Sequence, residues 1–479
     1  MKLIVLVPSR NYQSSAGARV RYGRLAAGLQ AHGIFLQLQP INDFNPLIAD
    51  FDALVISKCH DARSLLAAAA ASGRGKLVGV DLFDDYFSQH ADSRLLRYRD
   101  WLRAILQDCH FALCSTPPLA EVTRQYSPDL PVHVVNDPAP SQSVWEILSL
   151  ADRKAEEASR TGAIRACWFG VGDNPHFEIG LADLSAHSSA VLELSQAVKV
   201  ELSVLTNRRA LDADGLDMLA GLPIDLTLLE WSETAEQEVL QRADLAFLPV
   251  SPALFSRAKS LNRAFTSLAF GCQILSVGHP LYEALDPLIY RDPAVYLADL
   301  RAGTLRLSVT RKDEYCRHLE ELGSEDTEAV RLSSFLATLE PPQLKKEQPR
   351  ICVVHGMATR AEVHNFTAGI GGLSVASPYC SAELDFDVDF RRVPLGEAFL
   401  GSERRRGFRR FWRRRADDRP AGFPKNDRGA PSVAFEMATY GHTMRQIATR
   451  LAEMLGPVRI ILSETARIPV SLTEAGQDG

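Results

Sequence analysis

Short apolar runs alternate with helical segments over most of this chain. The runs of the first part have the length and composition of buried strands, and they lie at 3–7, 51–56, 76–80, 111–114 and 132–135. A second set follows at 165–169, 200–205, 224–229, 245–249 and 273–277. Strands that alternate with helices favour a parallel sheet covered by helices on both faces. Because the pattern occurs twice, we expect two similar α/β domains, each built on a parallel sheet.

The domain boundaries follow from this alternation and from the length of 479 residues, which exceeds what one hydrophobic core organises. Pro341 and Pro342, followed by a polar run, indicate a linker after the second set of strands. We predict a first domain at 1–140, a connecting helix at 141–163, a second domain at 164–340, a linker at 341–349 and a small α/β module at 350–479.

The C-terminal module has the weakest pattern of the chain. Residues 351–354 and 458–462 are predicted strands, 383–390 alternates as an exposed strand does, and 433–455 is a predicted helix. Residues 404–415, RRRGFRRFWRRR, form a basic run with interleaved aromatic side chains. Such a run suits contact with an anionic membrane surface, and a charged solvated loop is the alternative.

The stretch 247–277 contains the strongest candidate for a binding site. It predicts a buried strand, a helix at 258–270 and a second buried strand. A helix N-terminus presents unpaired N–H groups and positive partial charge, which suits a pyrophosphate. Polar and basic residues gather there, namely Ser256, Lys259, Ser260, Asn262 and Arg263. The alternative is that Lys259 and Arg263 are solvated surface residues.

Glycines and polar residues follow two other predicted strands. Gly170, Gly172 and Asn174 come after the first strand of the second domain and would let a ligand approach the backbone, although a plain strand–helix turn fits the pattern equally well. Ser15, Gly17 and Arg21 come after the first strand of the chain. They are candidates to close over phosphates or an acceptor, or they form a simple surface loop.

Acidic residues follow the third predicted strand, where a cleft residue is expected. Asp81, Asp84 or Asp85 could orient or deprotonate a hydroxyl group of a ligand, whereas Asp84 or Asp85 could equally cap the next helix. Lys58 and His60 also follow a strand. A lone histidine is more often structural than catalytic, so His60 is a secondary candidate.

Composition excludes several classes of protein. The formal net charge of −6 disfavours a general nucleic-acid-binding protein. The eight cysteines lack CxxC pairs and histidine partners at ligand spacing, so we predict neither a metal site nor a disulfide framework. No stretch approaches the ~20 apolar residues of a membrane span. We therefore expect a cytoplasmic protein, with 404–415 as its contact with the inner face of a membrane.

With these elements in order, residues 1–340 resemble the GT-B glycosyltransferases, specifically the retaining, nucleotide-sugar-dependent type similar to glycosyltransferase family 4. The segments that carry the resemblance are SSAGARVRYGRLAAGLQAHG, VGVDLFDDYF, FALCSTPPLAEVTRQY, VVNDPAP, CWFGVGDN, LEWSETAEQEVLQRADLAFLPV and AKSLNRAFTSLAFGCQILSVGHPLYEAL. The resemblance implies two Rossmann-like domains that face a cleft, with an acceptor-side first domain and a nucleotide-sugar second domain. It also implies metal-independent transfer without a bound cofactor. Positive side chains and helix-start amides would neutralise the leaving diphosphate.

The sequence departs from this family at two positions. Many members carry two glutamates eight positions apart in the donor site, and matching the glycine after the helix to Gly271 puts Ala258 and Thr266 there. Neither can accept a ribose hydroxyl as a carboxylate would. We therefore expect either a glycosyltransferase, acting on a glycan or lipid-linked acceptor with Lys259, Asn262 and Arg263 in the donor site, or a catalytically inactive GT-B-like scaffold that serves as a binding subunit.

Overall fold

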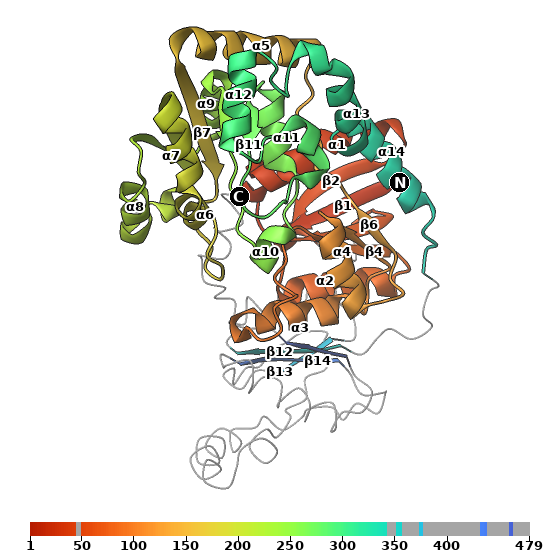
Figure 1. Cartoon of the computed structure of the whole chain (residues 1–479). Coiled ribbons are helices and arrows are strands. Elements are labelled where there is room, and N and C mark those ends of the chain that lie inside the picture. The colour runs from red at the N-terminus through yellow and green to blue at the C-terminus, as the bar shows by residue number, and fades with distance from the viewer. Residues whose placement is uncertain (45–48, 343–350, 357–372, 377–431, 438–458, 463–479) are drawn as a thin grey trace, which may run out of the picture.

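The computed structural model describes residues 1–44, 49–342, 351–356, 373–376, 432–437 and 459–462. Two α/β domains make up residues 1–342, and each is built on a parallel sheet (Figure 1). None of the helices in the described ranges is both long and apolar enough to cross a membrane.

The first domain contains a six-stranded parallel sheet with the order β2-β1-β3-β4-β5-β6. Its strands are β1 (Lys2–Val7), β2 (Phe35–Pro40), β3 (Ala53–Ser57), β4 (Leu77–Leu82), β5 (Phe111–Cys114) and β6 (Val132–Val134). The helices that connect them are α1 (Arg24–Ala31), α2 (Ala62–Gly73), α3 (Leu96–Ile105) and α4 (Pro117–Tyr126). Every residue of β3, β4 and β5 is buried, as expected for central strands covered on both faces.

The second domain contains a five-stranded sheet with the order β11-β10-β7-β8-β9, again with parallel pairings. Its strands are β7 (Ala163–Gly170), β8 (Lys199–Thr206), β9 (Leu226–Glu230), β10 (Leu245–Phe247) and β11 (Gln273–Leu275). Its helices are α6 (Leu181–Ala186), α7 (Ser188–Ala197), α8 (Ala213–Ala220), α9 (Glu233–Arg242), α10 (Leu254–Arg257), α11 (Asn262–Ala269) and α12 (Pro293–Ala302). The prediction of two parallel-sheet α/β domains is confirmed.

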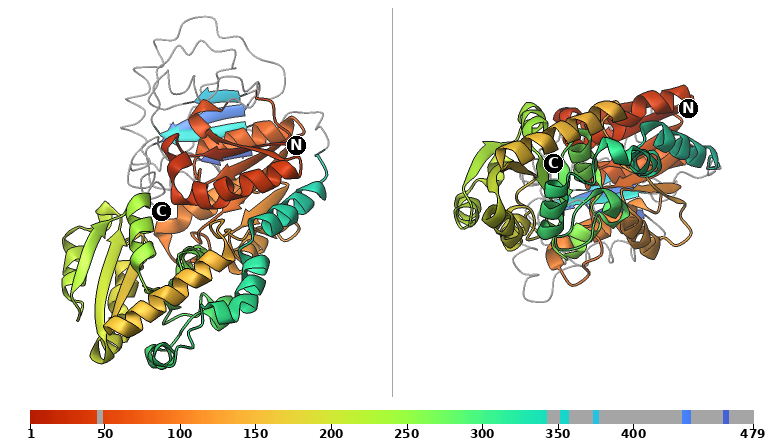
Figure 2. Two further views of the ribbon diagram at one scale, coloured as in Figure 1. Left: turned by 90° about the horizontal axis from the view of Figure 1, so that it is seen from above. Right: turned by 45° about the horizontal axis from the view of Figure 1, so that its top comes forward.

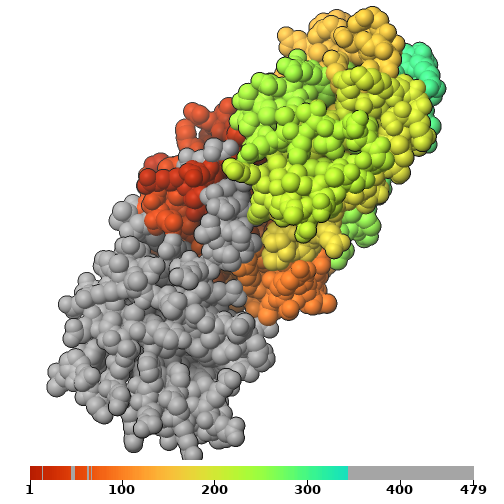
Figure 3. Space-filling model, turned by 90° about the vertical axis from the view of Figure 1, so that its left-hand side faces the viewer, coloured from red at the N-terminus to blue at the C-terminus, as the bar shows by residue number. Residues whose placement is uncertain are grey.

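Three further helices join and brace the two domains, namely α5 (Val144–Thr161), α13 (Lys312–Leu322) and α14 (Glu325–Ala337). Helix α5 runs from the first domain into β7, and α14 packs on the first domain (Figure 2). Gly28 of α1 permits this packing, because a Cβ there would lie 2.7 Å from the Cβ of Ala329. Leu332 and Leu336 of α14 join the core of the first domain. In the space-filling view, the yellow-to-green residues of the second domain form one lobe beside the red and orange residues of the first (Figure 3).

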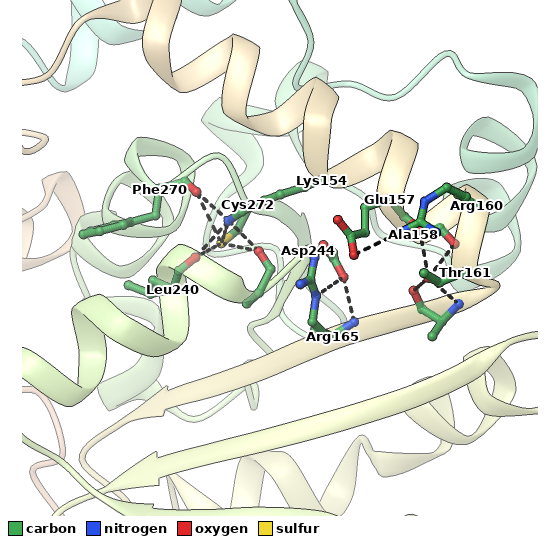
Figure 4. Close-up of polar contacts among 12 residues, drawn as sticks. Lys154, Glu157, Ala158, Arg160, Thr161, Arg165, Leu240, Asp244, Phe270 and Cys272 are labelled. Atoms are coloured by element: carbon green, nitrogen blue, oxygen red, sulfur yellow. Dashed lines mark hydrogen bonds and ion pairs between the residues drawn. The ribbon is translucent and has the colours of Figure 1, made fainter.

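A buried lysine connects α5 to two helices of the second domain (Figure 4). Lys154 is 5% exposed and donates hydrogen bonds to the carbonyl oxygens of Leu240 (2.9 Å), Ala243 (2.6 Å) and Phe270 (2.7 Å). These carbonyls lie at the ends of α9 and α11, which leave unpaired oxygens and negative partial charge. Lys154 therefore fixes the C-terminal ends of the two helices whose opposite ends approach the first domain.

The last four described strands form a separate parallel sheet with the order β13-β14-β12-β15. They are β12 (Ile351–Gly356), β13 (Leu373–Ala376), β14 (Ser432–Met437) and β15 (Arg459–Leu462). The predicted helix at 433–455 is wrong at its start, because 432–437 is a strand. The basic-aromatic run at 404–415 and the predicted strand at 383–390 lie outside the described residues.

Candidate functional site

The two sheets turn the carboxyl ends of their strands toward one cavity of about 270 Å³. Ligands bind parallel α/β sheets where the strand order reverses, because the helices on either side leave a crevice there. The order reverses between β1 and β3 in the first sheet and between β7 and β10 in the second. Residues at or beyond the ends of these strands line the cavity, among them Gly17, Lys58, Gly170 and Val250. Both domains thus contribute their expected binding edge to the same space.

Side chains from both domains also meet beside the cavity. Tyr86 of the first domain packs against Phe177 and Phe255 of the second, with ring centroids 5.9 and 5.3 Å away. The Thr116 hydroxyl donates a hydrogen bond to the carbonyl oxygen of Ala258 (3.1 Å). Tyr86 and Phe255 line the cavity. These contacts join the two domains beside the cavity.

Asp84 forms the central polar contact of the cavity. Its Oδ1 lies 2.5 Å from Lys259 Nζ of the second domain, and its Oδ2 lies 3.6 Å from Lys58 Nζ. Burial favours the neutral form of Asp84, but the two ammonium groups outweigh it and hold the pKa of Asp84 well below its ordinary value. Asp84 is therefore a carboxylate at neutral pH. A strongly depressed pKa makes it a weak base, so the geometry favours an orienting role over proton abstraction.

Lys58 is a candidate whose backbone is unusual. It has φ of 53°, a left-handed conformation that costs energy for a residue with a Cβ. Lys58 directly follows β3. Its side chain lines the cavity, and its Nζ lies 5.0 Å from the centroid of the Phe83 ring. His60, by contrast, packs among aromatic rings, with centroids 4.6 Å from Trp101 and 5.3 Å from Tyr98. Burial lowers the pKa of His60 to about 3, so it is neutral at physiological pH.

The stretch 253–270 differs from its predicted form. The helix α11 begins at Asn262 rather than at 258, and a turn separates it from the short α10. Lys259 lies in that turn, so Lys259 and Arg263 are not one turn apart on a single helix. All five predicted residues still line the cavity, namely Ser256, Lys259, Ser260, Asn262 and Arg263.

Arg263 lies over the backbone that ends β7. Its Nη1 donates to the carbonyl oxygen of Phe169 (3.3 Å), and it has no carboxylate partner among the described residues. Gly170 has φ of 150°, and a Cβ there would lie 3.1 Å from Arg263 Nη1. Glycine therefore gives Arg263 room above the end of β7. Asn174, also predicted as a binding residue, lines the same cavity, and its Oδ1 accepts a hydrogen bond from the N–H of His176 (2.9 Å).

Six predicted candidates do not line the cavity, namely Ser15, Arg21, His60, Asp81, Asp85 and Gly172. Ser15 is buried, and its hydroxyl accepts a bond from the N–H of Ala18. Asp85 accepts bonds from the N–H groups of Phe87 and Ser88, so it fixes the turn after β4. A Cβ at Gly172 would lie 2.3 Å from Thr206 Oγ1, which makes this glycine a packing requirement.

Arg21 lies beneath the cavity wall in a buried polar network. It donates from Nη1 to Asp81 Oδ1 (2.7 Å) and from Nε to Asp137 Oδ1 (2.9 Å). The Tyr22 hydroxyl donates to the other oxygen of Asp81 (2.6 Å). Burial raises the pKa of Asp81 despite this arginine. Arg21 and Asp81 therefore act through Asp137, which lines the cavity, rather than by touching a ligand themselves.

Sequence reasoning missed several cavity residues, namely Arg19, Arg24, Asp137, Trp231 and Glu236. Trp231 directly follows β9, so the strand-end rule that singled out Asp84 and Gly170 could also have found it. Arg19 lies in a π-helical turn (Ala18–Gly23), and Arg24 is the first residue of α1. π-Helical turns occur frequently at functional sites, but nothing in the sequence announces one here.

Ala258 and Thr266, the two positions matched to glutamates in the family that the sequence resembles, differ in their relation to the cavity. Thr266 lines the cavity from α11, while Ala258 is buried outside it. No group of three or more His, Cys, Asp or Glu side chains in the described ranges could hold a metal ion. Six cysteines of those ranges are free, among them Cys59, Cys114 and Cys272.

No known family profile matches the chain, and no curated protein matches it. Several solved structures are similar at low identity. Anabaena HepE in complex with UDP and glucose is 12% identical, with a TM-score of 0.47 over 71% of this chain and 100% of that one. Trehalose-6-phosphate synthase from E. coli with UDP-2-fluoro glucose is 13% identical, with a TM-score of 0.48 over the same shares.

An α,α-trehalose-phosphate synthase from Burkholderia xenovorans in complex with glucose-6-phosphate is 13% identical, with a TM-score of 0.44 over 68% of this chain and 84% of that one. In this chain itself, two parallel sheets share a cavity at their carboxyl edges, and α14 returns to the first domain. This is a GT-B fold. Arg263 and Gly170 line the cavity from the second domain, and Asp84 and Lys58 line it from the first.

Proposed function

We propose that this chain is a glycosyltransferase that moves a sugar from a nucleotide-sugar donor to a glycan or lipid-linked acceptor. One observation carries the proposal: Arg263, a guanidinium without a carboxylate partner among the described residues, lies in the shared cavity above Gly170, at the point where the second sheet reverses its strand order. A diphosphate at this place would meet Arg263, the N-terminus of α11 and the hydroxyl groups of Ser256 and Ser260.

Transfer from a nucleotide sugar requires positive charge beside the leaving diphosphate. As the glycosidic bond breaks, negative charge builds on the leaving diphosphate, and a fixed guanidinium stabilises that charge without reorganisation. Lys259 lies on the same wall and carries a second positive charge. We propose that transfer proceeds with retention at the sugar, without a metal ion or another bound cofactor. Asp84 would hold the acceptor hydroxyl near the anomeric carbon, on the face of the sugar from which the diphosphate leaves.

The second candidate is an inactive GT-B-like scaffold that serves as a binding subunit. It is favoured by the absence of carboxylates at Ala258 and Thr266 and by the pairing of Lys259 with Asp84, which already neutralises one candidate cation. An inactive scaffold would release no nucleoside diphosphate from any donor. Turnover therefore distinguishes the two candidates.

The experiment is a release assay for nucleoside diphosphate with the full chain. A panel of UDP-, GDP-, ADP- and CDP-sugars is offered with and without a mixture of oligosaccharide and lipid-linked acceptors. We expect release from at least one donor, increased by an acceptor. Absence of release from the whole panel, together with absence of nucleotide binding, would support the scaffold.

We also propose that the run at 404–415 adds affinity for the inner face of a membrane. Each basic residue near an anionic surface contributes on the order of 1 kcal/mol. Replacing Arg404, Arg405, Arg406, Arg409 and Arg410 by Ser should strongly weaken sedimentation with anionic vesicles at low salt and leave turnover on a soluble acceptor unchanged. Unchanged sedimentation would contradict the membrane contact.

A further inference from the structure

Two aromatic side chains of the second domain are buried in the hydrophobic core of the first. Phe177 lies in the segment between β7 and α6, and Phe255 lies in α10. Both belong to the core cluster formed around β3, β4 and β5 of the first domain, and Phe255 is 1% exposed. Their rings stack with centroids 4.3 Å apart, against Tyr86 of the first domain. We call the cross-domain set of Tyr86, Tyr98, His176, Phe177 and Phe255 the aromatic junction.

His176 is the member of the aromatic junction that can take up a proton near neutral pH. Its ring centroid lies 6.1 Å from that of Tyr86 and 6.0 Å from that of Tyr98, and both pairs of rings are nearly perpendicular. Nδ1 and Nε2 of His176 are buried and have no hydrogen-bond partner among the described residues. A protonated ring would therefore bring a positive charge and two unpaired N–H donors into this contact.

The charged groups that face His176 do not offset such a charge. Arg94 donates from Nη2 to the carbonyl oxygen of His176 (3.1 Å), and the guanidinium carbon of Arg97 lies 4.6 Å from the centroid of the Tyr98 ring. Asp92, the carboxylate that faces the ring, is already paired with Arg94 (2.7 Å). The two tyrosines of the junction are uncharged at neutral pH. Two guanidinium groups and one paired carboxylate therefore leave a protonated His176 without compensation.

The pKa of His176 links a proton to the stability of the junction. Burial lowers this pKa below its ordinary value of 6.5, and the charges of Arg97 and Arg94 lower it further. A ring that has moved into water recovers the ordinary pKa, so this group favours the intact junction fully above pH 6.5 and progressively less below it. His60 packs on the same tyrosines, but it belongs to the first domain and its pKa of about 3 keeps it neutral over this range.

We propose that protonation of His176 releases the aromatic junction and so makes the contact between the two domains acid-sensitive. The proton comes from solvent and binds Nδ1 or Nε2, and the charged ring moves into water together with the segment 174–179 and α10. The cavity beside the junction, which Tyr86 and Phe255 line, then opens toward solvent. This inference concerns the contact between the domains and does not depend on which ligand the cavity binds.

The experiment follows cleavage of the full chain by chymotrypsin, which cuts after aromatic residues. Phe255 is buried in the first domain, so cleavage after it requires release of the junction. When release and return are fast relative to cleavage, the rate follows the population of the released form, even where that form is rare. Each rate is divided by that of a synthetic peptide of residues 250–262 at the same pH, which removes the pH dependence of the protease. Cleavage after Phe111, buried in β5, reports global unfolding.

The parent should release the junction more often in acid. Between about pH 7.5 and about pH 5.5, relative cleavage after Phe255 should rise by up to about tenfold, because an exposed histidine gains about a factor of ten over one pH unit below its ordinary pKa. Cleavage after Phe111 should not change. His176→Gln cannot titrate in this range and should stay within about twofold. His32→Gln is the control, because His32 is exposed at the end of α1, and it should follow the parent.

Three outcomes would overturn the inference. The first is a parent whose relative cleavage after Phe255 is constant with pH, and the second is an equal rise in the parent and in His176→Gln. The third is a joint rise after Phe255 and Phe111, which would show that acid unfolds the chain instead of releasing the junction. His176→Phe is measured beside His176→Gln, because its ring suits the aromatic neighbours if the glutamine variant fails to fold. It should be as insensitive to pH as His176→Gln.

Discussion

Lys259 Nζ of the second domain lies 2.5 Å from Asp84 Oδ1 of the first, which makes these two side chains an ion pair across the cavity. The Lys259 side chain is 39% exposed and that of Asp84 is 17% exposed. Lys58 approaches the same carboxylate from the first domain. The pair therefore connects the wall proposed to bind the donor with the wall proposed to face the acceptor.

Asp84→Asn should lower the free energy of unfolding at neutral pH by about 1–2 kcal/mol, because it removes the negative charge that pairs with Lys259 and Lys58. This value lies between those typical of exposed and of buried ion pairs. The pKa of Asp84 is lowered in the folded state, so the unfolded chain takes up the proton first as pH falls. The stabilisation is complete above the ordinary carboxyl pKa of 3.8 and is lost as pH falls below it toward the folded-state value. Urea denaturation of parent and variant between pH 7 and pH 3 measures this difference.

Glu157→Gln is the matched control for Asp84→Asn. Glu157 belongs to an exposed pair with Arg160 on α5, and its removal should change stability by no more than ~0.5 kcal/mol. A difference between parent and Asp84→Asn that stays constant down to pH 3 would show that the carboxylate charge is not what stabilises this contact.

Lys154→Met should destabilise the protein by about 3 kcal/mol, because it leaves the buried carbonyl oxygens of Leu240, Ala243 and Phe270 without their donor. Methionine fills a similar volume, so the loss reports the hydrogen bonds more than a cavity. Lys199→Met is the control, since Lys199 is 71% exposed. Equal denaturation midpoints for the two variants would refute the role assigned to Lys154.

Much of the fold could be predicted because apolar runs and helix caps are local signals. Thr116 and Ser232 accept hydrogen bonds from the first turns of α4 and α9, as their positions in the sequence indicate. Strand β5 was predicted with its correct bounds. Strand β2 was missed, since its buried and exposed residues alternate weakly. The segment 432–437 was misassigned because a short apolar run fits a strand as well as a helix.

Cavity residues could be predicted where they lie at strand ends or at a helix start. Lys58, Asp84 and Gly170 lie at strand ends, and all three line the cavity. The residues predicted at the helix start also line it, namely Ser256, Lys259, Ser260, Asn262 and Arg263. Arg24 and Glu236 were not found, because each lies on a helix with no local sign of a ligand and the two meet only when the domains pack. Arg21 was assigned to the site because it follows the glycine turn, yet its side chain turns into the buried network with Asp81.

Transfer should be independent of divalent metal ions. The cavity offers Lys259 and Arg263 for the charge that develops on the leaving diphosphate, which is the task a metal ion performs in other transferases. Turnover should therefore survive excess EDTA within about twofold. Loss of turnover in EDTA that Mn²⁺ or Mg²⁺ restores would contradict this prediction.

The central claim, that a nucleoside diphosphate binds at Arg263, is tested most directly by calorimetric titration of the four common nucleoside diphosphates into the parent, Arg263→Ala, Lys259→Ala and Arg257→Ala. Arg257 is the control, because it is exposed on α10 and does not line the cavity. The parent and Arg257→Ala should bind the same nucleotide equally. Arg263→Ala should lose about 10- to 100-fold in affinity, and Lys259→Ala should lose less because Asp84 already neutralises it. Unweakened binding by a folded Arg263→Ala variant would place the donor site elsewhere and contradict the account.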